Sequence, residues 1–171
     1  TGLAGSSFQC DYYWKNEALL RKIREYVYNG GGYLGIGDPS GYLHAGQYFQ
    51  LSDILGVQKE VGFSYAKKKL YPLLTTSHWI TSDLDMNKVK FGKQGLSVYP
   101  INATVLASAW TTTDSYERVQ AAGHVNLSVN DYGKGRAVFI SSLEDSSEAY
   151  RLIYKALLYV YHHENKYLSC I

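Results

Sequence analysis

The chain has 171 residues, of which 46% are hydrophobic and 19% charged, and its formal net charge is +2 at pH 7. This composition excludes a disordered or collagen-like chain, and the charge is too small to indicate a nucleic-acid-binding surface. The length predicts one domain, or two very small ones, and is sufficient for a core. The order of elements described below favours a single α/β domain over residues 1–171. The sequence contains no run of about 18 apolar residues, so it predicts no membrane span. The two cysteines do not make a disulfide framework, so we expect a cytoplasmic protein.

The first predicted helix covers residues 17–29. Asn16 is a suitable N-cap, and apolar residues recur after it at helical spacing among charged ones. The three glycines at 30–32 end this helix. The short apolar run 33–37 is typical of a buried parallel strand, and the polar residues 38–41 predict a turn after it.

A parallel strand that is reached through a helix implies an earlier strand before that helix. Residues 1–8 are small and polar, as in a loop that follows a strand. We therefore expect the sequence to be part of a longer protein, cut near the end of its first strand. The alternative is that strand 33–37 is the first in the sheet and that the helix only packs on it.

The rest of the chain predicts strands followed by a last helix. A second, short helix is expected over 48–55, and an antiparallel pair near 123–140 turns at 130–135. The residues between them predict short strands, namely part of 57–65, then 88–91, 96–99 and 104–108. Asp145 and Glu148 form a capping box for the last helix, whose apolar stripe runs from Ala149 to Val160.

This order of elements predicts a three-layer fold of flavodoxin-like or amidotransferase-like type. We expect a mostly parallel sheet with helices on both faces, a buried strand 33–37 and a small antiparallel section.

The turn after strand 33–37 is the first candidate ligand site, because α/β folds bind ligands where parallel strands end. Asp38 or Ser40 could bind a hydroxyl group, and His44 in the following loop is a further candidate ligand residue. The glycine spacing does not complete a dinucleotide-binding motif, and Pro39 removes an amide donor. A purely structural turn and a plain loop histidine are therefore the favoured alternatives.

A second candidate position follows strand 138–140. Amidotransferase-like domains carry a nucleophilic cysteine at the first turn and a His-x-Glu after a later strand. Here the first turn holds no thiol, and Ser142 stands where the histidine would be. Glu144 could occupy the acidic position, but the sequence predicts no catalytic triad and no thiol-dependent amide hydrolysis.

The remaining ionisable residues predict no metal site and no pair of catalytic acids. His162 and His163 precede Glu164 at a helix end, where adjacent side chains point apart, so a solvated helix end is expected. Asp83 and Asp85 are predicted to cap a turn.

The 17 tyrosines exceed what a core of this size can satisfy, since each buried phenol needs a hydrogen-bond partner. Tyr150, Tyr154 and Tyr161 lie along one side of the last helix. Without a basic patch, a base-stacking role is disfavoured, and this side is predicted to be an interdomain or subunit interface.

Two runs of the sequence resemble a known family. They read KIREYVYNGGGYLGIGDPS at residues 22–40 and QYFQLSDILGVQKE at residues 47–60. Both are similar to the central domain of the galacto-N-biose/lacto-N-biose phosphorylases, which belongs to the class I glutamine amidotransferase-like superfamily. Asp38 departs from the glutamate associated with that position in the family.

The resemblance implies a multidomain, cytoplasmic bacterial enzyme. An N-terminal barrel would carry the catalytic acid and the phosphate site, and a C-terminal β-domain would follow the central domain. The implied reaction is the reversible phosphorolysis of a β-galactoside to galactose 1-phosphate, with inorganic phosphate as co-substrate and no cofactor.

On this interpretation residues 1–171 are a non-catalytic scaffold or assembly domain. Its partners would be the barrel and the β-domain of the same chain, and a homodimer is left open. Neither a nucleic acid nor a membrane is expected as a partner. The alternative is a stand-alone sugar- or small-molecule-binding amidotransferase-like module.

Overall fold

The computed structural model describes residues 14, 16–37, 39–40, 42–43, 48–59, 77–91, 98–111 and 122–166. The elements in chain order are α2 (Glu17–Tyr28), β1 (Gly32–Ile36), β2 (Tyr42–Leu43), β3 (Tyr48–Phe49), α3 (Ser52–Leu55), β4 (Val57–Lys59), β5 (Val98–Pro100), β6 (Thr104–Thr111), β7 (Ala122–Tyr132), β8 (Gly135–Ile140), α5 (Ser147–Val160) and the 3₁₀ helix η1 (Glu164–Lys166). Among these residues, none of the helices has the length and apolar character needed to span a membrane.

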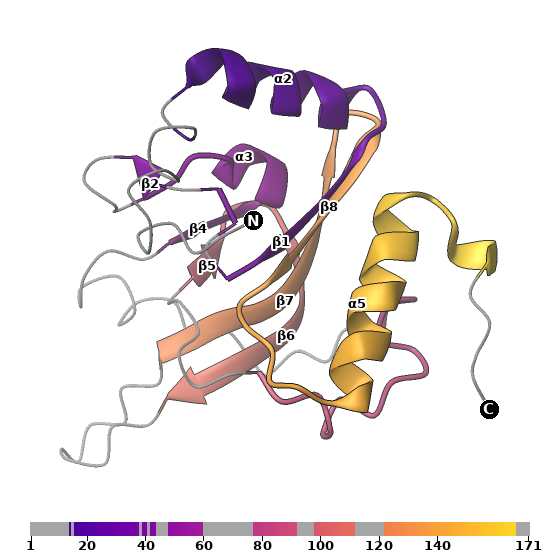
Figure 1. The fold of residues 1–171 in the computed structure, drawn as a ribbon. Helices are drawn as coiled ribbons and strands as arrows, with labels where there is room; N and C mark the ends of the chain where they lie inside the picture. Colours follow the sequence, from indigo (N-terminus) through magenta and orange to yellow (C-terminus); the bar gives the residue numbers. More distant parts are fainter. Residues whose placement is uncertain are drawn as a thin grey trace, which may run out of the picture.

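The largest sheet has the strand order β1-β8-β7-β6 and is mixed (Figure 1). β1 runs parallel to β8, whereas β8 with β7 and β7 with β6 are antiparallel. The prediction of a mostly parallel sheet is therefore wrong for the described residues. The predicted antiparallel pair is present, but it forms the middle of the sheet instead of a small section, and β6 extends it.

Among the described residues, β1 is an edge strand of this sheet, although the sequence predicts a buried strand there. Gly35 is buried, and its neighbours in β1 are half-buried. Helices lie on both faces of β1, which accounts for its continuous apolar sequence, but β8 is its one strand partner in the described part of the chain.

Side-chain caps fix the residues at which the two main helices, α2 and α5, begin. The Asn16 side chain accepts hydrogen bonds from the backbone N–H groups of Ala18 and Leu19, at 3.0 and 3.2 Å, as the sequence predicts. The N-cap of α5 is Ser146, whose Oγ accepts from the N–H of Ala149 at 3.1 Å. The predicted cap at Asp145 is thus one residue too early.

Two further expectations from the sequence are corrected. The predicted helix over 48–55 divides into β3 and the single turn α3, which ends at Gly56. Residues 88–91 form no strand. They follow a turn in which the Lys88 N–H donates to the Asp85 carbonyl at 2.9 Å.

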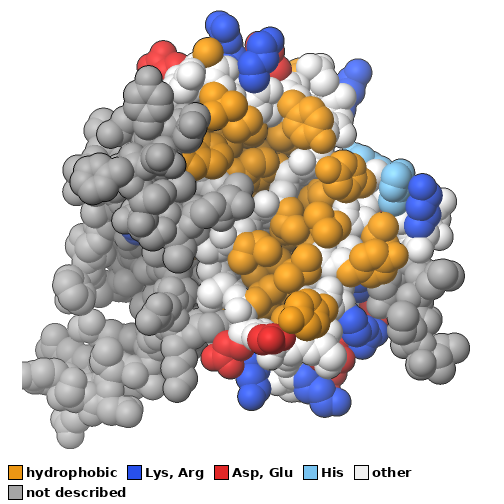
Figure 2. Space-filling view, in the orientation of Figure 1, with side chains coloured by type: hydrophobic (Ala, Val, Ile, Leu, Met, Phe, Trp, Pro, Cys, Tyr) orange, Lys and Arg blue, Asp and Glu red, His pale blue; other side chains and the backbone are white. Residues whose placement is uncertain are grey.

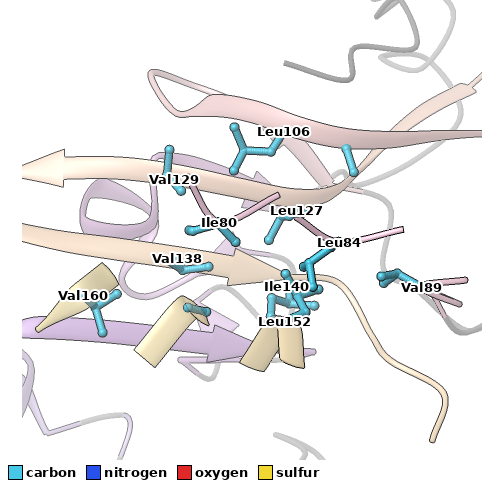
Figure 3. Close-up of a cluster of buried hydrophobic side chains, with 12 residues drawn as sticks. Ile80, Leu84, Val89, Leu106, Leu127, Val129, Val138, Ile140, Leu152 and Val160 are labelled. Atoms are coloured by element: carbon cyan, nitrogen blue, oxygen red, sulfur yellow. The ribbon is translucent and has the colours of Figure 1, made fainter. Parts of the chain in front are cut away.

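The core lies on both faces of the sheet, and β8 supplies side chains to each. Val138 and Ile140 pack with Leu152 of α5 on one face (Figure 3). Ala137 and Phe139 contact clusters on the other face, and these clusters contain the buried residues of α2 and α3, namely Leu20, Val27, Ile54 and Leu55. The period-two alternation of β8 therefore joins α5 to the layer that contains α2 and α3.

Gly135 allows α2 to approach the start of β8. A Cβ atom at this position would lie 2.0 Å from the carbonyl oxygen of Val27 and 2.3 Å from that of Gly31. These distances are far below a van der Waals contact, so the approach requires glycine.

Candidate functional site

The carboxyl ends of β1 and β8 lie side by side. Ile36 is in register with Ile140, and the Gly37 N–H donates to the Ile140 carbonyl at 2.9 Å. Gly37 has a φ of +69°, which turns the chain away from the sheet just after this bond. Two predicted candidate segments, the turn at 37–40 and residues 141–144, therefore follow neighbouring strands at the same edge.

The described part of the first turn is held by structural contacts. Ser40 is fully buried, and its Oγ accepts a hydrogen bond from the Leu51 N–H at 3.2 Å. The Tyr33 hydroxyl donates to the Pro39 carbonyl at 2.6 Å, and burial raises the pKa of this phenol. Ser40 thus connects the turn to the segment before α3. Asp38 and His44 lie outside the described residues.

The segment after β8 is fixed at both of its ends. Ser141 is buried, its N–H donates to the Asn126 carbonyl at 2.9 Å, and its Oγ lies 3.1 Å from Asn126 Oδ1. Glu144 is exposed, and its N–H donates to the Lys90 carbonyl at 2.9 Å. Ligand binding by Ser40 and Glu144 stays a prediction.

Sequence reasoning missed a buried lysine on α5. Lys155 is 1% exposed, and its Nζ contacts Asp83 Oδ1 and lies 4.9 Å from the centre of the Trp79 ring. Burial lowers the pKa of Lys155 to about 8. Asp83 is therefore an ion-pair partner instead of a turn cap, whereas Asp85 caps as predicted, accepting from the Asn87 N–H at 3.2 Å. The signal in the sequence is a lysine inside the apolar stripe of the helix.

A second cluster links α5 to β8 and to residues 77–91. The Arg136 guanidinium lies 4.5 Å above the Tyr159 ring and pairs with Glu164, while the His78 ring meets the Tyr159 ring edge-on, with centres 5.0 Å apart. Burial lowers the pKa of His78, and the positive charge of Arg136 lowers it further. His162 and His163 are exposed as predicted, but Glu164 is half-buried in its ion pair.

Among the described residues, no group of three or more His, Cys, Asp or Glu side chains is placed to hold a metal ion. The contacts of both clusters hold residues 77–91 on α5.

The predicted interface tyrosines are exposed on α5. Tyr150, Tyr154 and Tyr161 have exposed fractions of 63%, 47% and 55%, and Leu157 between them is 40% exposed. Their spacing of four, three and four residues places them on one side of the helix. We call these four residues, Tyr150, Tyr154, Leu157 and Tyr161, the α5 stripe. Figure 2 shows hydrophobic side chains gathered over the face that carries α5 and α2.

Comparison with known proteins assigns the family. Residues 1–165 match the family described as the lacto-N-biose phosphorylase central domain, and the chain belongs to this family. A 1,3-beta-galactosyl-N-acetylhexosamine phosphorylase of Lachnoclostridium phytofermentans is 34% identical over 151 residues, which are 88% of this chain and 19% of that protein. The corresponding enzyme of Bifidobacterium longum subsp. longum is 29% identical over 187 residues, covering 91% of this chain and 24% of that protein. The chain thus spans about a fifth to a quarter of the length of these relatives.

Solved structures of similar fold come from β-galactosidases. A catalytic mutant of Gan42B, a GH42 beta-galactosidase from G. stearothermophilus, matches with a TM-score of 0.52 and 20% identity over 84% of this chain and 19% of that chain. The beta-galactosidase from Bacillus circulans sp. alkalophilus matches with a TM-score of 0.51 and 17% identity over 86% of this chain and 20% of that chain. At these identities the likeness concerns the fold alone.

Proposed function

We propose that this chain is a non-catalytic scaffold and assembly domain of a β-galactoside phosphorylase. The observation that carries the proposal is the α5 stripe, an exposed aromatic surface on a helix that is otherwise anchored in the core. Aromatic side chains are enriched at protein interfaces, and large exposed apolar patches are uncommon on monomers.

The parent enzyme would phosphorolyse a galactosyl-N-acetylhexosamine or a galactosyl-rhamnose reversibly, releasing galactose 1-phosphate. This proposal is supported by the names of the relatives, which include a D-galactosyl-beta-1->4-L-rhamnose phosphorylase. Inorganic phosphate would be the co-substrate, no cofactor would take part, and the enzyme would be cytoplasmic. An amidotransferase-like ancestry of the domain is part of the same proposal.

The partners of the α5 stripe would be a catalytic barrel and a β-domain of the same chain. This assignment is supported by the share of the relatives that lies outside the matched region. Among the candidate residues, Ser40 supports a domain without chemistry of its own, because its hydroxyl is buried and accepts a hydrogen bond from the Leu51 N–H.

A first experiment tests the assembly role. We expect the 171-residue chain to self-associate through the α5 stripe in light scattering. Without its partner, an interface of ordinary size would expose about 800 Å² of this chain's surface to solvent. Replacing Tyr150, Tyr154 and Tyr161 by Gln, which has a good helix propensity, should give a monomer. The control Ile101→Gln removes an exposed apolar side chain that does not belong to the α5 stripe and should leave self-association unchanged. A wild-type chain that is monomeric at high concentration would contradict the assembly role.

A second experiment tests the absence of catalysis. Incubation of the chain with phosphate and galactosyl-β-1,3-N-acetylglucosamine should release no galactose 1-phosphate. Sustained turnover that a single substitution in this chain abolishes would overturn the non-catalytic assignment.

A further inference from the structure

A pocket of about 260 Å³ lies where β6 begins beside β7. It is lined by Asn102, Thr104, Val129, Asn130, Asp131 and Tyr159. Pairing of β6 with β7 starts at Thr104 opposite Val129, and the next residues of β7 pair with β8 in the described sheet. The pocket lies at the sheet edge because β6 does not pair with these next residues of β7. Tyr159 of α5 forms one of its walls.

Four polar side chains of this pocket have no hydrogen-bond partner among the described residues, and we call them the uncommitted groups. Within the described chain, the Asn102 amide, the Thr104 hydroxyl, the Asp131 carboxylate and the Tyr159 phenol make no hydrogen bond to another protein group. Asn130 differs from them, because its Nδ2 donates to the Ile54 carbonyl at 2.8 Å and so fixes it as a wall. The uncommitted groups offer both donors and acceptors to a ligand.

The uncommitted groups stand on paired backbone. The N–H groups of Asn102 and Ala103 donate to the Gly56 carbonyl at 3.2 and 3.1 Å, which holds the turn before β6. The Tyr159 ring is held between Arg136 and His78. A ligand would therefore meet a backbone and a Tyr159 ring that are already placed, which lowers the entropy cost of binding.

Charge restricts the class of ligand. Asp131 is the charged residue among those that line the pocket, and the nearby Arg136 is paired with Glu164. An anion such as a phosphate group would face the Asp131 carboxylate without a cation to bind it. A ligand with several hydroxyl groups suits the lining better, because carboxylate, amide and phenol groups all bond to hydroxyls.

We propose that this pocket binds one ring of a neutral carbohydrate. Pockets for drug-sized ligands have volumes of roughly 300–1,000 Å³, and this pocket lies just below that range, so it suits a ligand smaller than these. The site lies apart from the α5 stripe and from the turn at 37–40, so it does not depend on the proposed assembly role.

The test is saturation-transfer NMR on the 171-residue chain with D-galactose, N-acetyl-D-glucosamine and galactose 1-phosphate as probes, at up to about 50 mM. We expect at least one neutral sugar to bind and the phosphorylated sugar to bind more weakly. Asp131→Asn and Thr104→Val should each weaken binding about tenfold, which is typical of a lost hydrogen bond to a ligand. The control Glu17→Gln removes the same charge from the exposed first turn of α2 and should bind as the wild type does.

Thermal unfolding of each variant shows whether a loss of binding comes from a loss of folding. Thr104→Val keeps a β-branched residue in the strand, so this variant retains the fold and still tests the site. The proposal is overturned if no neutral sugar binds, if both pocket variants bind as well as the wild type, or if galactose 1-phosphate binds as tightly as galactose.

Discussion

Lys155 Nζ of α5 contacts the carboxylate of Asp83, and these two residues connect the last helix to the segment 77–91. Asp83 also lies 3.5 Å from Arg151 Nη2. Lys155 is almost fully buried, whereas Asp83 is about one third exposed. The carboxylate of Asp83 therefore stabilises the ammonium group of Lys155, whose burial among apolar residues is otherwise unfavourable.

Asp83→Asn should destabilise the protein, because it removes the negative charge that contacts the buried ammonium group of Lys155. Breaking a buried pair costs about 3–5 kcal/mol. The exposure of Asp83 reduces this cost, so we expect a loss of about 2 kcal/mol or more in the free energy of unfolding, measured with urea.

Two variants serve as controls for this prediction. Asp85→Asn changes an exposed carboxylate in the same turn and should cost about 0.5 kcal/mol or less. Lys155→Met replaces the buried charge by an apolar chain and should be tolerated better than Asp83→Asn. Equal effects of Asp83→Asn and Asp85→Asn would show that the ion pair contributes nothing.

The stability of the protein should rise with pH above about 8 through Lys155. Burial lowers the pKa of this residue in the folded state to about 8, below its ordinary value of 10.5. Between these two values the unfolded chain binds more protons than the folded chain, so the free energy of unfolding increases with pH.

This increase should be sought between pH 8 and 10 by urea unfolding of the wild type and of Lys155→Met. Above that window, the ionisation of tyrosines in the unfolded chain acts in the opposite direction, since burial raises the pKa of Tyr33 and Tyr159. The wild type should gain stability relative to Lys155→Met as the pH rises. Parallel curves for the two proteins would refute the lowered pKa.

Local patterns predict the elements of this chain well. Asn16 and the glycines at 30–32 bound α2, and the two-residue turn at Gly133 joins β7 to β8 as expected. The closeness of Gly37 to the segment after β8 follows only once β1 and β8 are known to be parallel neighbours, because the carboxyl ends of such strands share an edge.

Features that depend on distant pairing could not be predicted in this way. The order β1-β8-β7-β6 requires knowing that β8 joins β1 on one side and a hairpin partner on the other. Likewise, the burial of Lys155 becomes understandable only when Asp83, 72 positions away, is placed beside it. The polar pocket forms from residues of β6, β7 and α5 whose separate sequences show no binding motif.

Substitution of two glycines should separate steric clash from backbone strain. Among the described residues, a Cβ at Gly37 would come nearest to the Ser141 carbonyl oxygen, at an ordinary 3.9 Å, but Gly37→Ala forces a residue with a side chain to adopt a φ of +69°. This should cost about 1–2 kcal/mol. Gly135→Ala would place Cβ 2.0 Å from the Val27 carbonyl oxygen, so α2 must move and the cost should be larger, about 3 kcal/mol. Thermal unfolding measures both variants, and an equal or smaller loss for Gly135→Ala would contradict the close approach of α2 to β8.

The last prediction concerns the start of α5, where Asp145 and Ser146 compete as the N-cap. The Ser146 Oγ accepts from the Ala149 N–H at 3.1 Å, and the side chain of Asp145 instead bonds to exposed Tyr150 and raises the pKa of that phenol. Ser146→Ala should therefore cost about 1 kcal/mol, the usual value for a lost cap. Asp145→Ala should cost about 0.5 kcal/mol or less, since it removes only a surface contact. Urea unfolding of the two single variants decides between the caps, because α5 carries one face of the core and its loss would unfold the whole sheet. A larger loss for Asp145→Ala would restore the capping box that the sequence alone predicts.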